Sequence, residues 1–199
     1  MLVKDMFLKK ANFIYLLLTL IFYSSAPKCV ELQTKLLEYN TSLKNTLFSF
    51  IQNDNTSVEE GQLYIGEDRI KIIYKSPNQV SIVVSENKGM YVNHELKEAQ
   101  FFDTKKTLVN IFFKIIWDKS FFKNAEIINL NNNIRIKKVI YFNDINNFIE
   151  IKYQNEPLLI RKIIIKNNNQ NYEMGFFNHT KVDFLEKNFF SMVNPYIQN

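Results

Sequence analysis

Glycine and proline are scarce in this sequence, with four of each among 199 residues. The glycines, Gly61, Gly66, Gly89 and Gly175, are too scattered to form the glycine-rich loop that binds phosphate groups. Flexible linkers are rich in glycine, so its scarcity favours strands over linkers. The length suits one domain with a sizeable core.

Cysteine and histidine are almost absent: Cys29 is the only cysteine, and His94 and His179 are the only histidines. A single cysteine excludes an internal disulfide. Neither histidine has a second His or Cys at the spacing of metal ligands, so no metal site is expected. We find no activated nucleophile or paired carboxylates, and therefore expect no catalytic residues, no cofactor and no enzyme.

Arginine is also rare, with only Arg69, Arg135 and Arg161 among the 25 basic residues. The formal net charge is +5, but the lysines are interspersed with apolar residues along predicted strands, as on a solvated sheet face. There is no basic cluster or nucleic-acid-binding motif, so nucleic acid is not an expected partner.

The N-terminus has the pattern of a secretory signal peptide. Lys4, Lys9 and Lys10 precede an apolar run over residues 11–23, and small residues follow at 24–26. A membrane-spanning helix needs about 20 apolar residues, so an uncleaved anchor is the weaker alternative. We predict a signal peptide over residues 1–25 and one mature domain over residues 26–199. Cys29 follows a poor lipidation sequence and is expected to be inert.

Periodicity predicts the elements in order. Apolar residues at spacings of four and seven predict a helix over residues 30–44. Alternation of apolar and polar residues, with turn residues between the runs, then predicts strands at 47–52, 62–65, 69–75, 79–85, 88–92 and 97–102. Helical spacing returns over residues 104–117, with Thr104 or Thr107 as the cap. Asn-rich turns at 131–133, 146–147 and 167–169 separate strands predicted at 125–130, 134–141, 148–153, 158–166 and 171–177. A last short strand and a turn at Pro195 are predicted within residues 189–197.

These elements predict a mainly β (α+β) fold with a single antiparallel sheet, because turns this short join only antiparallel neighbours. A sheet of so many strands in one small domain must curl on itself. We therefore expect an unclosed β-barrel with helices covering its concave face. One face of the strands at 69–75 and 79–85 is apolar, formed by Ile70, Ile72, Tyr74, Val80, Ile82 and Val84.

An ordered series of short motifs resembles the periplasmic lipoprotein carrier family, LolA. The chain has Phe-Ile-Gln at residues 50–52, where the family has Phe-x-Gln. It has Gly-Gln-Leu-Tyr-Ile at residues 61–65, where the family has Gly-x-Leu/Phe-aromatic-Ile. Tyr74, Pro77 and the block over residues 83–91 then follow in the family's order. The resemblance spans about residues 43–108.

One position departs from the family pattern. Family members commonly have Arg-Pro after the glycine-containing strand, and that arginine latches a lid. Glu67 and Asp68 stand there in this chain, so the latch is not carried over. Arg69 follows, either as a substitute or as an ordinary residue beside a turn. Tyr91 stands in place of the family's tryptophan.

The resemblance implies a chaperone that binds the acyl chains of lipoproteins in its apolar concave face. It implies an inner-membrane lipoprotein-releasing ABC transporter and an outer-membrane acceptor as partners, and the periplasm as location. A monomer is expected.

Two groups of residues are candidates for the ligand site. The expected wall of the acyl cavity is Phe48, Phe50, Ile70, Ile72, Tyr74, Ile82, Val84 and Tyr91. The expected lid is Leu108, Ile111, Phe112 and Ile115. Three alternatives stay open: these side chains form a dry core, the domain is a non-transporting lipid or lipoprotein-binding sensor module, or it is an exported enzyme.

Overall fold

The structure is a computed structural model and describes residues 26–197 apart from 169, 184 and 187. It divides into two compact units, Met1–Glu38 and Tyr39–Asn199. Helix α2 (Ala26–Thr41) makes up the described part of the first unit and continues over residues 39–41 into the second. The predicted signal peptide, residues 1–25, lies outside the described residues.

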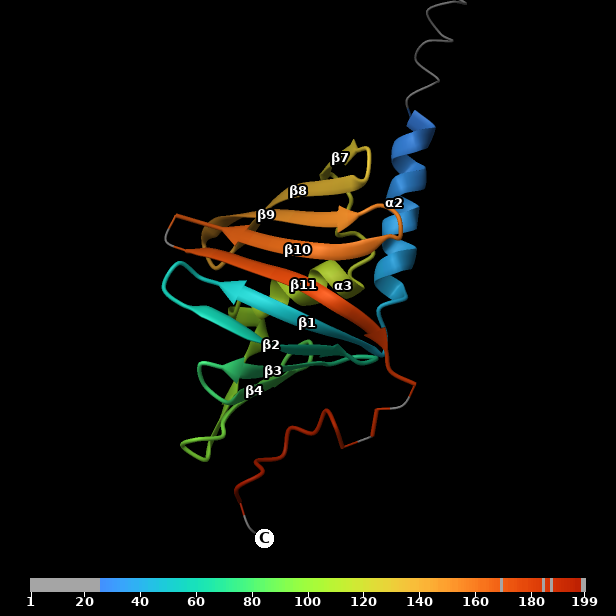
Figure 1. Cartoon of the computed structure of the whole chain (residues 1–199). Helices are drawn as coiled ribbons and strands as arrows, with labels where there is room; N and C mark the ends of the chain where they lie inside the picture. The colour runs from blue at the N-terminus through green and yellow to red at the C-terminus, as the bar shows by residue number, and fades with distance from the viewer. Residues whose placement is uncertain (1–25, 169, 184, 187, 198–199) are drawn as a thin grey trace, which may run out of the picture. The chain divides into compact units, whose positions relative to one another are not determined.

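The second unit contains one antiparallel sheet of eleven strands (Figure 1). The first six strands are β1 (Thr46–Asn53), β2 (Val58–Ile65), β3 (Ile70–Ser76), β4 (Val80–Val84), β5 (Gly89–Asn93) and β6 (Glu98–Phe102). A short 3-10 helix and an α-helix follow, η1 (Thr104–Lys106) and α3 (Val109–Trp117). The last five strands are β7 (Glu126–Leu130), β8 (Asn133–Phe142), β9 (Ile145–Gln154), β10 (Leu159–Lys166) and β11 (Asn171–Lys181).

The strand order shows two meanders joined at the centre of the sheet. It runs β6-β5-β4-β3-β2-β1-β11-β10-β9-β8-β7, so the first and last strands pair with each other. In that central pair Phe50 lies opposite Phe176. Strands β6 and β7 form the two edges, and the sheet is not closed. The prediction of a mainly β fold with an unclosed antiparallel sheet is confirmed.

Neither Thr104 nor Thr107 is the N-cap of a helix as predicted. Asp103 caps η1 through its side chain, and Leu108 precedes α3 without a side-chain cap.

Two further local predictions were wrong. Residues 189–197 contain no strand, although the turn predicted at Pro195 is present. Asn146 and Asn147 lie inside β9, and the turn before it is made by Asn143 and Asp144. Both of these turn residues have positive φ, 51° and 60°, as a two-residue hairpin turn requires.

Asparagine supplies the left-handed backbone that glycine supplies in many proteins. No described glycine has a positive φ. Eight other residues do, and most are asparagines: Asn45, Asn55, Lys97, Asn124, Asn131, Asn143, Asp144 and Asn178. Asparagine tolerates this conformation better than most residues with a side chain. The chain therefore makes tight hairpin turns with very few glycines.

The C-terminal segment, residues 188–197, packs on the outer face of the first meander. The Arg69 guanidinium donates to the Phe190 carbonyl (Nη1 to O 2.8 Å), and the Lys71 ammonium donates to the Phe189 carbonyl (2.9 Å). Lys71 also lies 4.1 Å from the centre of the Phe189 ring. Arg69 therefore binds the C-terminal segment on the outer face.

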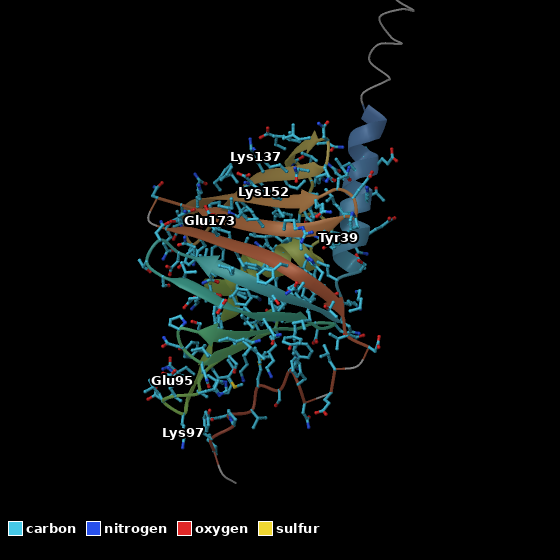
Figure 2. The ribbon with its side chains drawn as sticks, in the orientation of Figure 1. Tyr39, Glu95, Lys97, Lys137, Lys152 and Glu173 are labelled. Atoms are coloured by element: carbon cyan, nitrogen blue, oxygen red, sulfur yellow. The ribbon has the colours of Figure 1, made fainter. Side chains whose placement is uncertain are left out.

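The outer face of the second meander is polar and charged. Lys137 and Lys152 lie on β8 and β9, and Glu173 lies on β11 (Figure 2). Ion pairs join neighbouring strands, including Lys162 to Glu173 at 2.8 Å and Arg135 to Glu150 at 3.2 Å. Partly exposed pairs of this kind contribute little stability, and the lysines mainly keep this face soluble.

His179 on β11 is expected to make stability depend on pH. Burial lowers its pKa below the ordinary 6.5, although its Nε2 donates to the Ile160 carbonyl at 2.9 Å, which opposes the shift. The unfolded chain therefore binds a proton more readily than the folded chain. Above about pH 6.5 His179 is neutral in both states and does not affect the free energy of unfolding. As the pH drops from 6.5 to the pKa of the folded state, proton binding by the unfolded chain lowers the free energy of unfolding. Urea unfolding at pH 7.5 and pH 5 should show the fall, and His179→Gln should reduce it. An identical fall in the variant would contradict this assignment.

Candidate ligand-binding cavity

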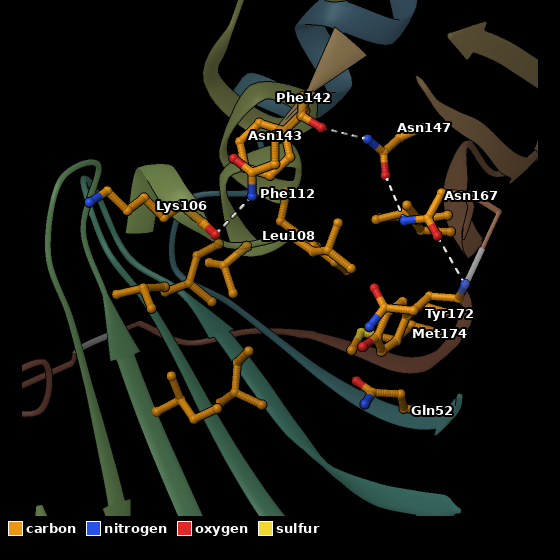
Figure 3. A pocket seen from close by; sticks show the side chains of 18 of the residues that line it. Gln52, Lys106, Leu108, Phe112, Phe142, Asn143, Asn147, Asn167, Tyr172 and Met174 are labelled. Carbon is orange, nitrogen blue, oxygen red and sulfur yellow. Dashed lines mark hydrogen bonds between the residues drawn. The ribbon is translucent and has the colours of Figure 1, made fainter. Parts of the chain in front are cut away.

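An apolar cavity of about 420 Å³ lies between the concave face of the sheet and the segment that contains η1 and α3 (Figure 3). The first meander lines it with Gln52, Leu63, Ile70, Ile72, Tyr74, Ile82 and Val84. The second meander and its turns line it with Phe142, Asn143, Ile145, Asn147, Ile163, Ile165, Asn167, Gln170, Tyr172 and Met174. Lys106, Leu108, Val109 and Phe112 complete it. Both halves of the sheet face the same space, so the sheet is curved.

Most of the residues predicted for the cavity wall do line this space. They are Ile70, Ile72, Tyr74, Ile82 and Val84. Ile72 pairs with both Leu63 and Ile82 across neighbouring strands, which places the three side chains on the same face. That these residues bind an acyl chain stays a prediction.

The other three predicted wall residues do not line the cavity. Phe48 and Phe50 are completely buried in the sheet's core, where Phe50 meets the ring of Tyr74 edge-on at 5.3 Å. Both lie on the concave face beside the cavity, because Phe48 pairs with Leu63 and Phe50 pairs with Gly61 across β1 and β2. Tyr91 lies opposite Ile82 in the register of β4 and β5, on the same face but outside the cavity.

The predicted lid divides into two stripes. Leu108 and Phe112 line the cavity, whereas Ile111 and Ile115 do not and are each only 1% exposed. Residues four apart share one side of a helix, and a shift of one position rotates the side chain by about 100°. The periodicity identified an amphipathic helix but not which of its two apolar stripes meets the ligand space.

The sequence predictions missed the contribution of the second meander. Ile163 and Ile165 alternate on β10, and Tyr172 and Met174 alternate on β11. This alternation was a usable signal that one face of these strands is apolar. That they share a cavity with β3 and β4 follows only from the pairing of β1 with β11.

Linked side-chain amides form one side of the cavity (Figure 3). Asn147 is only 1% exposed, and its Nδ2 donates to the carbonyls of Phe142 (3.3 Å) and Ile145 (3.0 Å). Its Oδ1 accepts from Nδ2 of Asn167 at 3.1 Å. The Oδ1 of Asn167 accepts from the backbone N–H of Gln170 at 2.9 Å. These bonds fix the β8–β9 and β10–β11 turns to each other.

A second polar chain begins at Tyr74. Its hydroxyl donates to Oε1 of Gln52 at 3.2 Å, and Nε2 of Gln52 donates to Glu59 at 3.0 Å. Burial raises the pKa of the Tyr74 hydroxyl, and the nearby Glu59 carboxylate adds to the shift. Burial also raises the pKa of Glu59, with a further contribution from Asp54. Tyr74 therefore presents a neutral hydroxyl to the cavity.

Three hydrogen bonds hold the η1–α3 segment in place. Thr104 is fully buried and donates to the Glu86 carbonyl at 2.7 Å. Asn40 is 2% exposed, and its Nδ2 donates to the Ile115 carbonyl at 2.6 Å in the last turn of α3. Asn143 is exposed, and its Nδ2 donates to the Lys106 carbonyl at 3.0 Å. The Asn143 bond is the one of the three that lies at the surface, beside the cavity.

Replacing Asn143 with glycine is expected to speed ligand entry. Glycine accepts the positive φ of this turn but removes the bond to Lys106, which connects the β8–β9 hairpin to η1. Without this bond, the free-energy cost of displacing the η1–α3 segment would fall by about 1 kcal/mol. An acyl probe should then associate about five times faster. Stopped-flow fluorescence would measure it. Asn131→Gly is the control, because Asn131 has a similar positive φ but lies outside the cavity. Equal rates in both variants would contradict a gating role.

A serine–histidine contact lies on the outer face, away from the cavity. The Oγ of Ser81 is 2.9 Å from Nε2 of His94, and Nδ1 of His94 is 2.8 Å from the Tyr196 hydroxyl. Ser81 sits in mid-strand, paired with Ile73 and Val92 on both sides. These contacts hold the C-terminal segment against β4. In a catalytic triad a carboxylate would bind Nδ1 of the histidine, whereas here the Tyr196 hydroxyl does so.

The described residues contain neither a metal-binding cluster nor a membrane-spanning helix. No group of three or more His, Cys, Asp or Glu side chains there is arranged to hold a metal ion. Within the same residues, no helix has both the length and the apolar character needed to cross a bilayer.

Comparisons with known proteins show the fold and no family. No model of a protein family matches the chain, and no curated protein does. The crystal structure of an uncharacterized conserved protein from Thermus thermophilus is similar, with a TM-score of 0.51 and 6% identity over 78% of this chain and 89% of that one. A structure of PNGF-II has a TM-score of 0.35 and 11% identity, over 73% of this chain and 30% of that one. At 6% identity the Thermus likeness concerns the fold alone.

Proposed function

We propose that this protein is a periplasmic chaperone that binds the acyl chains of lipoproteins in its cavity and carries them from the inner to the outer membrane. The observation that carries the proposal is the apolar cavity between the curved sheet and the η1–α3 segment. The order of motifs that resembles the LolA family supports the same function.

The physical reason for such a carrier is the cost of exposing acyl chains to water. Each exposed methylene group costs about 0.8 kcal/mol, so a chain of a dozen or more carbons does not leave a membrane unless a protein covers it. Isoleucine, leucine and valine side chains supply the cover here, among them Leu63, Ile72 and Val84. Binding and release of this kind need no covalent step.

The proposal includes two membrane partners. An inner-membrane ABC transporter would hand over the lipoprotein, and an outer-membrane acceptor would receive it. Apart from a few turn residues, the η1–α3 segment is the part of the cavity wall that does not belong to the sheet, so its displacement would admit a chain without breaking the strand ladder.

Lipid content and acyl uptake test the proposal. We expect organic extraction of the purified protein to release acyl lipids, and a fluorescent fatty acid to bind saturably at one site. Competition by unlabelled fatty acid would show that the site is specific. A protein that carries no lipid and takes up no acyl probe would contradict the proposal.

A non-transporting binding or sensor module is the second candidate, favoured by the two sheet edges. The outer sides of β6 and β7 have no neighbouring strand within the described sheet, so an envelope protein would have an edge to pair with. Depletion of the protein separates the two functions. Loss of a carrier should leave lipoproteins at the inner membrane, whereas loss of a sensor should change signalling and leave their location normal.

A further inference from the structure

The cavity is polar on one side and apolar on the other. Asn147, Asn167, Tyr172 and Gln52 lie on one side in Figure 3, with Met174 among them. Leu108 and Phe112 lie across the space, with Asn143 beside them. An amphiphile that enters such a space has one favourable orientation, with its polar group at the amides and its chain against the apolar wall.

Charge is nearly absent from the lining. Lys106 is the one cavity residue with a charged side chain at neutral pH among those described, and its ammonium points away from the amide side (Figure 3). A carboxylate or phosphate placed against the amides would lose water without gaining a cation, which is strongly unfavourable. A neutral amide, ester or hydroxyl group would exchange its hydrogen bonds to water for bonds to the protein.

Two side chains on the amide side of the cavity have unused hydrogen-bonding capacity. Among the described residues, no hydrogen bond is found to the Tyr172 hydroxyl or to the side-chain amide of Gln170. Both residues line the cavity, but Tyr172 is half-buried whereas Gln170 is exposed to solvent. Asn147 and Asn167, by contrast, are already bonded to each other. The Tyr172 hydroxyl is therefore the best-placed donor for a ligand carbonyl.

The volume limits the number of chains. An apolar cavity of about 150 Å³ takes up one benzene, so the present cavity has room for roughly three six-carbon groups. That is the size of one long acyl chain, and a second chain would need a wider space between the sheet and α3.

We propose that the cavity selects a single acyl chain joined to an uncharged hydrogen-bonding head, such as an amide or ester, with Tyr172 binding the head. This inference rests on the proposed function and narrows it, because it specifies which chain of a lipoprotein would be held. An amide-linked or ester-linked chain would enter, while the rest of the cargo stays outside.

Competition against a fluorescent monoacylglycerol at pH 8 tests the selectivity. The competitors are 1-monomyristoylglycerol, sodium myristate and 1,2-dimyristoylglycerol. We expect the first to compete at concentrations at least tenfold lower than the other two. Tyr172→Phe keeps the ring and removes the hydroxyl, and it should weaken monomyristoylglycerol about fivefold, the effect of one hydrogen bond, while leaving myristate unchanged. Tyr64→Phe is the matched control, since Tyr64 lies on β2 outside the cavity.

The outcomes separate this inference from the function on which it rests. Failure of every acyl probe to bind would overturn the proposed function itself. Equal competition by all three lipids, or stronger competition by the two-chain lipid, would overturn the selectivity and leave acyl binding standing. An unchanged preference in Tyr172→Phe would overturn the role of the hydroxyl.

Discussion

Replacing Gly61 with alanine is expected to lower the free energy of unfolding by about 3 kcal/mol, because a methyl group has no space there. A Cβ at this position would overlap the backbone carbonyl oxygen of Ile73 on the neighbouring strand. It would also lie 2.9 Å from Cζ of Phe50, whose side chain is fully buried. The carbonyl cannot rotate away as a side chain does, so β2 and β3 would have to separate.

Urea unfolding of the variant beside Gly175→Ala would measure this effect. Gly175 also lies in a strand, β11, but the nearest atoms to a Cβ there are 3.9 Å away, an ordinary contact distance. We expect that control to stay within about 0.5 kcal/mol of the unsubstituted protein. A similar loss in both variants would show that the cost comes from backbone conformation and not from the close approach of β3.

The same close approach explains why the sequence motif at residues 61–65 begins with glycine. The pairing of β2 with β3 shifts register between Glu60 and Gly61, and the Ile73 carbonyl oxygen lies where a Cβ at position 61 would be. The ring of Phe50 fills the space that a side chain at position 61 would occupy. The glycine is therefore needed for packing, although its φ is not in the left-handed region.

Local features of the fold could be predicted from the sequence. Alternation along residues 70–74 and 80–84 places their apolar side chains on one face, and that face does line the cavity. Short turns between the strands fixed the antiparallel neighbours within each meander. These signals depend only on residues a few positions apart, which is why they were sufficient for the strands and hairpins.

Features that depend on long-range pairing could not be predicted in this way. Nothing near Phe50 or Phe176 in the sequence indicates that β1 pairs with β11, yet this pairing joins the two meanders into one curved sheet. The contacts of Arg69 with the C-terminal segment join residues more than a hundred positions apart. The amide cluster likewise forms only when the turns near Asn147 and Asn167 meet.

Filling the cavity is the most direct test of where an acyl chain binds. Ile82 lies in the middle of β4, and its side chain lines the space. In Ile82→Trp the indole would enter an open volume instead of a packed core, so the fold should tolerate it better than an equal enlargement elsewhere. We expect the affinity for a fluorescent monoacylglycerol to fall at least twentyfold, with a melting temperature within a few degrees of the original.

Tyr91→Trp is the matched control because Tyr91 lies directly opposite Ile82 on β5, faces the same side of the sheet and does not line the cavity. A tryptophan there should leave acyl affinity within about twofold. If both variants bind as tightly as the original protein, the chain occupies some other surface, and the cavity between the sheet and α3 is not the acyl site. A loss confined to Ile82→Trp would place the chain against β4, because the two substitutions introduce the same indole on adjacent strands and differ in whether it occupies the cavity.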